Sequence, residues 1–178
     1  VTALYGVGGG DTINGEINTI DGEGESLFEA FENLKKSNKK NITLAYTGFF
    51  LLGEGLVDSS VEDTIYYLVK DETVKMNALL FVTKDVKAKD VIKDAKENET
   101  MIQDDLTAMV QKRLESVTRN ENTILWLYED LADAQSSMII PYLNYEEKEL
   151  TLGGYTALLD GRKEAYLDEA TSLGADLL

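Results

Sequence analysis

The sequence predicts an α/β protein whose second half is of the α+β type. We expect a mixed sheet with strand–helix–strand crossovers, then helices followed by a small antiparallel sheet. Two apolar runs rich in β-branched and aromatic residues, 42–52 and 74–82, are each followed by an amphipathic helical pattern. This order predicts a right-handed parallel crossover. Near the end, an Asp-Gly pair between two further strand-like segments predicts a hairpin.

The segment before the first apolar run contains short strands and the clearest helix. Residues 1–7 predict a strand, and one arrangement adds it to the same sheet. The glycines at 8–10 predict a turn or a flexible link, and residues 12–21 predict a weak strand. Ser26 begins a helix, because Ser26 and Glu29 form a capping box ahead of an apolar stripe. The stripe consists of Leu27, Phe28, Phe31 and Leu34.

The two apolar runs flank a second helix. Residues 41–53 predict a nearly continuous strand covered on both faces, which breaks at Gly53-Glu54-Gly55. Ser59 and Ser60 are available to cap the next helix. Residues 74–82 predict a second buried strand, and a short helix follows it. The apolar residues of these two helices are Val61, Ile65, Leu68 and Val69, then Ala88, Val91, Ile92 and Ala95.

A polar stretch at 96–100 predicts a boundary between two domains. Residues 1–97 would form an N-terminal α/β domain. Residues 98–178 would form a second domain of helices followed by β-hairpins and a terminal helix. Its two helices carry apolar faces made of Ile102, Leu106, Met109, Val110 and Val117, then of Ile124, Leu125, Leu127, Tyr128 and Leu131.

The last third predicts short strands. Residues 138–143 form one of them, and Pro141 indicates an edge position because proline donates no ladder hydrogen bond. Asp160-Gly161 predicts a two-residue hairpin turn, and Asp168 would cap a helix running to residue 178. The other predicted strands are 150–152, 155–159 and 163–167.

Composition excludes several functional classes. The chain has 33 acidic and 17 basic residues and a formal net charge of −16, which argues against nucleic acid as a partner. It contains no cysteine, which removes disulfides and thiolate chemistry. It contains no histidine, which removes the commonest general base and metal ligand. Enzymes that use carboxylates, or serine with lysine, stay possible.

Candidate chemical motifs are better explained as structure. The glycines at 6–10 are followed neither by a helix nor by a Walker lysine, so no nucleotide site is predicted. The acidic pairs Asp104-Asp105 and Glu129-Asp130 fit solvated helix faces. Trp126 is expected in the core rather than at an interface. Asp160-Gly161 lacks the rest of a calcium loop, and no glycan is expected on the sequons at Asn41 and Asn98. No catalytic, cofactor-binding or metal-binding residue is predicted.

Several segments, in chain order, resemble the C subunits of bacterial spore germinant receptors, the GerAC family. Residues 22–34, GEGESLFEAFENL, resemble the start of that family's first helix, and residues 50–54, FLLGE, its buried strand. The similarity covers roughly residues 20–95 and 138–178. Its other segments are YLVKD at 67–71, MNALLFV at 76–82, AKDVI at 88–92, LTLGGYTALLDG at 150–161 and YLDE at 166–169.

The resemblance implies a function and a place in the cell. Family members are lipoproteins of sporulating Bacillus/Clostridium-type bacteria, held by a lipid-modified cysteine on the outer face of the spore inner membrane. They act with the membrane-embedded A and B subunits in nutrient-triggered germination, and have no known catalytic residue or cofactor. This chain would be the N-terminal portion, soluble by itself because the anchoring cysteine is missing from it. Tyr46 departs from the histidine of many members, and residues 98–137 match poorly.

Two other functional classes compete with this reading. The first is an enzyme that uses carboxylates, or serine with lysine, on an unrecognised α/β fold; it predicts a deep pocket with titratable groups in opposed environments. The second is an acidic surface protein that binds divalent cations, which predicts calcium-dependent stabilisation. The germinant receptor reading predicts broad surfaces for protein contacts instead.

Overall fold

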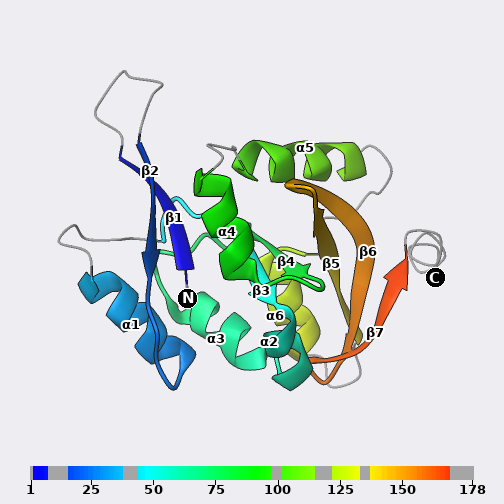
Figure 1. Ribbon diagram of the computed structural model, residues 1–178. Helices are drawn as coiled ribbons and strands as arrows, with labels where there is room; N and C mark the ends of the chain where they lie inside the picture. The colour runs from blue at the N-terminus through cyan, green and yellow to red at the C-terminus, as the bar shows by residue number, and fades with distance from the viewer. Residues whose placement is uncertain are drawn as a thin grey trace.

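The computed structural model describes residues 2–7, 16–37, 44–97, 102–114, 122–132 and 137–168 (Figure 1). Within these residues a two-stranded sheet and a five-stranded sheet combine with helices on both faces of the larger sheet. The elements are β1 (Thr2–Val7), β2 (Glu16–Asp21), α1 (Leu27–Ser37), β3 (Phe49–Gly53), α2 (Glu54–Ser59), α3 (Glu62–Lys70), β4 (Leu79–Thr83), α4 (Ala88–Glu97), α5 (Ile102–Leu114), α6 (Ile124–Ala132), β5 (Ser137–Glu146), β6 (Glu149–Leu159) and β7 (Arg162–Asp168).

The larger sheet is mixed and confirms the predicted fold class. Its strand order is β3-β4-β5-β6-β7. β3, β4 and β5 run parallel, whereas β5, β6 and β7 are antiparallel neighbours. The predicted crossover is confirmed, because β3 and β4 are adjacent and parallel with α2 and α3 between them in the chain. The antiparallel strands continue the same sheet instead of forming a separate one.

The N-terminal strand does not join the main sheet, so that expectation was wrong. β1 pairs with β2 in an antiparallel hairpin, from Thr2 opposite Asp21 to Val7 opposite Glu16. This hairpin contacts α4 and α1 (Figure 1). After it, Gly22 runs against the backbone of α1: a Cβ there would lie 2.1 Å from the carbonyl oxygen of Ala30. Only glycine allows the chain to return so closely onto the helix.

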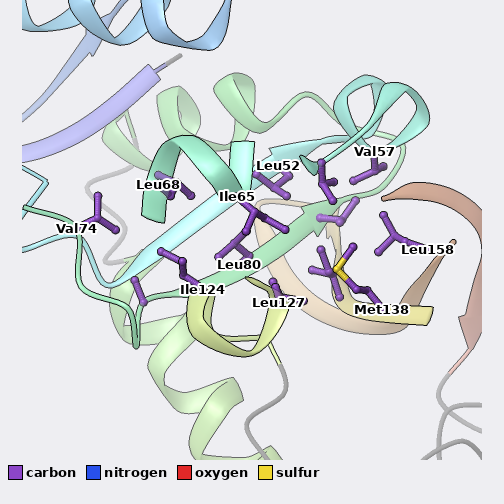
Figure 2. Packing of buried hydrophobic residues seen from close by; sticks show 14 of the residues in the cluster. Leu52, Val57, Ile65, Leu68, Val74, Leu80, Ile124, Leu127, Met138 and Leu158 are labelled. Carbon is purple, nitrogen blue, oxygen red and sulfur yellow. The ribbon is translucent and has the colours of Figure 1, made fainter. Parts of the chain in front are cut away.

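Two hydrophobic clusters cover the two faces of the sheet. The first lies under α1, α2, α3 and α6, and Figure 2 shows its packing around Leu80, Ile65 and Ile124. The second lies under α4 and α5, around Phe81, Val91 and Leu106. β4 supplies both, because Leu80 and Val82 belong to the first cluster and Leu79 and Phe81 to the second. All five residues of β4 are buried.

Both predicted parallel strands are shorter than expected. The strand predicted at 41–53 corresponds to β3, which begins only at Phe49. The residues described before it form a turn, in which the Thr47 N–H donates to the Leu44 carbonyl at 2.9 Å. In place of 74–82 the strand is β4, after a turn in which the Ala78 N–H donates to the Lys75 carbonyl at 3.0 Å. β3 is an edge strand and is mostly half-buried, but it is covered on both faces as predicted. Phe50 and Leu52 pack in the first cluster, and Phe49 and Leu51 pack against the second. The predicted break at Gly53 is confirmed, because β3 ends at Gly53 and α2 begins at Glu54.

A buried asparagine closes the amino end of β4. The Leu80 N–H donates to the Asn122 carbonyl, and the Asn122 side-chain amide donates to the Leu80 carbonyl, both at 2.9 Å. Asn122 is fully buried. The residues just before α6 therefore lie beside β4 at Leu80, whereas β5 pairs with β4 only from Tyr142 onward. A polar side chain is stable there because its hydrogen bonds replace those of a missing strand.

Pro141 does not mark an edge strand, because β5 lies between β4 and β6. Pairing of β5 with β4 begins one residue later, at Tyr142, so the missing N–H of Pro141 removes no bond from that ladder. The strands predicted at 150–152 and 155–159 form one strand, β6. Its pairing with β5 contains a bulge at Gly153. The predicted hairpin at Asp160-Gly161 is confirmed, with positive φ of 48° and 70°.

The helix starts follow the predicted chemistry. The Glu29 N–H donates to the Ser26 hydroxyl at 3.1 Å, as in a capping box, and the Glu29 carboxylate accepts the N–H of Glu25 rather than that of Ser26. The Ser60 hydroxyl accepts the Glu62 N–H at the start of α3. Asp168 ends β7, and the helix predicted after it lies outside the described residues.

The domain division at 97/98 stays a prediction. The sheet and the first hydrophobic cluster are continuous across it: β4 pairs with β5, and Leu80 packs with Ile124 and Met138 (Figure 2). The two halves therefore share apolar surface that neither could bury by itself.

The β5–β6 hairpin contains removable backbone strain. Glu147 and Lys148 form its two-residue loop with φ of 51° and 70°, where Asn-Gly is favoured. Glu147→Asn with Lys148→Gly should raise the free energy of unfolding by about 1 kcal/mol, measured by denaturant unfolding. Gly161→Ala in the other hairpin is the matched control and should destabilise, because its Cβ would lie 2.7 Å from Glu62 Cγ. Equal effects of the two changes would contradict this account.

A buried hydroxyl lowers stability on the first-cluster face. Thr156 is fully buried, and its Oγ1 has no hydrogen-bond partner among the described residues. Thr156→Val should therefore raise the free energy of unfolding by about 1 kcal/mol. Thr83→Val is the control and should lower it by a similar amount, because the equally buried Thr83 hydroxyl donates to the Val86 carbonyl at 3.0 Å. A loss of stability in Thr156→Val would show that the hydroxyl is satisfied.

Candidate functional site

Charged and aromatic side chains from distant parts of the chain meet beside the carboxyl ends of β3 and β4. We call this group the junction cluster. It consists of Glu54, Asp58, Lys84, Tyr142, Lys163 and Tyr166. Glu54 directly follows β3 and Lys84 directly follows β4, and parallel strands bring these two ends to the same edge of the sheet. α2 contacts β7, which carries Lys163 and Tyr166.

Lys163 is the most heavily bonded member of the cluster. Its ammonium lies 2.9 Å from Glu54 Oε1 and 2.7 Å from Asp58 Oδ1. It also lies 4.7 Å from the centre of the Tyr166 ring. The Tyr166 hydroxyl donates to the same Glu54 oxygen at 2.9 Å. Glu54 therefore ties α2 to two residues of the last described strand.

The pKa directions favour a charged carboxylate at Glu54, a charged ammonium at Lys163 and a neutral hydroxyl at Tyr166. Hydrogen bonds from Lys163 and Tyr166 lower the pKa of the Glu54 carboxyl. Hydrogen bonds to Asp58 and Glu54 raise the pKa of the Lys163 ammonium. Burial and the hydrogen bond to Glu54 raise the pKa of the Tyr166 hydroxyl. A general base or nucleophilic lysine is favoured by the opposite shifts, so these directions fit an ion-paired anchor between α2 and β7.

The other side of the cluster is aromatic. Tyr142 and Tyr166 meet edge to face with ring centres 5.0 Å apart. The Lys84 ammonium lies 5.2 Å from the centre of the Tyr142 ring and 5.1 Å from that of Tyr166. These distances place one ammonium within cation–π range of two rings.

A second exposed feature lies on the helix layer. Tyr66 of α3 and Tyr128 of α6 meet edge to face at 5.9 Å, and Leu125 precedes Tyr128 by one helical turn. We call these three residues the aromatic strip. Tyr66 is 39% exposed and Leu125 is 43% exposed. The exposed carboxylates of Asp63 and Glu129 flank the strip in sequence. An exposed aromatic and aliphatic group of this kind is typical of protein contact surfaces.

The sequence candidates do not form a site. Asp104 and Asp105 are exposed on the first turn of α5, and Glu129 is exposed on α6, as expected for solvated faces. Trp126 is half-buried and belongs to neither hydrophobic cluster, so its predicted core position was not found. The glycines at 8–10 and both sequon asparagines lie outside the described residues.

The described part of the chain contains neither a candidate metal centre nor a membrane-spanning helix. No group of three or more His, Cys, Asp or Glu side chains there could hold a metal ion. No helix in that part of the chain has the length and apolar character needed to cross a bilayer.

Sequence reasoning did not select the junction cluster. Glu54 and Lys163 are 109 positions apart, and neither has an unusual local context. One available signal was that both lie within or beside segments that resemble a single family, FLLGE at 50–54 and the hairpin at 150–161.

The fold and the site define a mixed-sheet α/β domain with an ion-paired anchor and an exposed aromatic strip. Comparison with protein families identifies the family to which this domain belongs. The chain belongs to the spore germination protein N-terminal domain family, whose model matches residues 1–145. This membership confirms the resemblance seen in the sequence and supports a role in spore germination.

One solved structure and the curated proteins complete the comparison. The chain is similar to a structure described as the GerBC protein, with a TM-score of 0.49 and 12% sequence identity over 96% of this chain. The match covers 53% of that protein, so the chain spans about half its length. No curated protein sequence matches the chain.

The anchor predicts a defined pH dependence. Glu54→Gln should lower the free energy of unfolding by about 1 kcal/mol near neutral pH, because it weakens the bonds to Lys163 and Tyr166. The folded-state pKa of Glu54 lies below its ordinary 4.5, so its contribution is present above that value and is lost as pH falls through the folded pKa. Denaturant unfolding at a series of pH values should show the difference between the two proteins shrinking on acidification.

The more exposed pair between Lys93 and Asp21, at 3.2 Å, supplies the control. Asp21→Asn should cost no more than about 0.5 kcal/mol. A Glu54→Gln effect that is absent, or that grows as the solution is acidified, would contradict the assignment of Glu54 as an ionised anchor.

Proposed function

We propose that this chain is part of a non-enzymatic C subunit of a nutrient germinant receptor, which acts through protein contacts. The observation that carries the proposal is the family match across residues 1–145. The partners would be the membrane-embedded A and B subunits at the outer face of the spore inner membrane. A lipid anchor outside this chain would hold the subunit there.

The junction cluster supports a binding role over a catalytic one. Lys163 has a raised pKa and two carboxylate partners, so it is protonated and unsuited to act as a base or a nucleophile. The Glu54 carboxylate has a lowered pKa and is a weak proton acceptor at neutral pH. These directions oppose the requirements of an enzyme that uses lysine or carboxylates at this site.

The aromatic strip is the surface that we propose for contact with a partner subunit. Exposed Asp63 and Glu129 flank it in sequence, on a chain of net charge −16. Self-association through this face would bring like charges together, whereas a partner with an apolar centre and a rim of lysine or arginine would complement it. We therefore expect the contacting region of the membrane subunits to be basic.

Co-purification tests the receptor role and the strip separately. Full-length lipoprotein should capture the A and B subunits from detergent extracts of spore membranes. Tyr66→Ser combined with Leu125→Ser should reduce capture at least about fivefold, because buried aromatic and aliphatic anchors dominate interface energy. Tyr46→Ser is the matched control, since Tyr46 is 87% exposed and lies outside the strip.

The two failures can be told apart. Full-length protein that captures neither subunit would overturn the receptor role. Normal capture by the Tyr66→Ser, Leu125→Ser protein would overturn only the assignment of the strip.

A further inference from the structure

The chain connections put the junction cluster at a special position of the sheet. β3 and β4 are parallel neighbours, but the segments that follow them leave on opposite faces. α2 follows β3 and packs in the first hydrophobic cluster through Val57. α4 follows β4 and packs in the second through Val91, and Figure 1 shows α4 and α2 on opposite sides of the sheet. In open α/β sheets, ligands commonly bind outside the carboxyl ends of the strands.

Lys84 is at this position and differs from the other cation of the cluster. Lys163 has two carboxylate partners within 2.9 Å. Lys84 is half-buried, and its described contacts for the ammonium are the faces of Tyr142 and Tyr166. Within the described residues no carboxylate pairs with Lys84, in a chain with 33 acidic residues. An ammonium without such a pair can accept an anion without first releasing a carboxylate of the described residues.

The surrounding groups restrict which anion would bind. Glu54 and Asp58 both pair with Lys163, and together with Lys84 these four side chains have no formal net charge, so a dianion would gain little. The two tyrosine rings offer an apolar wall beside the ammonium. On the same face, the Oγ1 of Thr156 is buried without a partner, and Thr156 is paired directly with Tyr166. A cation beside two rings fits a carboxylate attached to an apolar or aromatic body.

We propose that Lys84, Tyr142 and Tyr166 form a binding site for a small organic monocarboxylate at the carboxyl ends of β3 and β4. The Lys84 ammonium pairs with the ligand carboxylate, and the half-buried ring of Tyr166 contacts the ligand body. Tyr142, which is only 5% exposed, holds the Lys84 ammonium in place through its ring. Glu54 and Lys163 position Tyr166 through its hydroxyl and its ring. This site does not depend on the receptor role, because it follows from the sheet topology and the cluster alone.

Titration with sodium benzoate tests the site in the full 178-residue chain. Amide chemical shifts of Lys84, Asp85 and Tyr166 should change saturably with a dissociation constant on the order of 1 mM, an affinity expected for one ion pair and limited apolar contact. Lys84→Met should weaken binding at least about tenfold, which corresponds to loss of the ion pair. Lys84→Arg should retain binding, because the charge and the stacking on the rings are kept.

Three controls make the result specific. Lys75→Met should leave benzoate binding unchanged, because Lys75 makes the comparable contact with Tyr46, 5.7 Å from the ring centre, away from the cluster. Benzylamine, which has the same ring and the opposite charge, should not bind. Inorganic phosphate should compete poorly with benzoate.

Several results would overturn the proposal. They are a lack of saturable shifts with benzoate, equal binding of benzylamine, effective competition by inorganic phosphate, or unchanged binding in Lys84→Met. If Lys84→Met does not fold, Tyr142→Leu provides the second test, since it removes one ring while the ammonium stays. Full benzoate affinity in that variant would also overturn the proposal.

Discussion

The structure depends on the burial of one five-residue strand on both of its faces. β4 contributes Leu80 and Val82 to one hydrophobic cluster and Leu79 and Phe81 to the other. Burial of such side chains supplies roughly 1.5–3 kcal/mol each, so β4 contributes to both layers of helices at once. It also pairs with β3, with β5 and, through Leu80, with Asn122. Segments from both halves of the chain are therefore arranged around the same strand.

This arrangement also determines where the polar chemistry lies. α2 follows β3 directly and contacts β7, so Glu54 meets Lys163 and Tyr166 beside the carboxyl ends of β3 and β4. Glu54 and Lys163 then form an anchor whose groups are held in their charged forms, while the Lys84 ammonium lies over the rings of Tyr142 and Tyr166. The receptor role and the ligand site that we propose use different surfaces, because the aromatic strip lies on α3 and α6.

Local patterns made much of the fold predictable. The capping box at Ser26, the turn at Asp160-Gly161 and the parallel crossover each follow from residues close in sequence. Strand lengths were overestimated because Leu44 and Val74 are buried within turns, and hydrophobicity alone does not separate a buried turn from a strand. Pro141 misled because the start of the β4–β5 ladder depends on Asn122. The junction cluster could not be predicted, since its charged partners lie 109 residues apart in the chain.

We infer that both halves of the described chain fold as one unit around β4, in contrast to the division predicted at 97/98. Native-state hydrogen exchange at increasing denaturant measures this directly, because it reports the free energy of opening for each amide. The account predicts that the amides of Leu80, in β4, and Leu127, in α6, share one opening free energy equal to that of global unfolding. Exchange of Leu127 through a separate, lower-energy opening while Leu80 stays protected would contradict it, and would favour two independent units divided near residue 97.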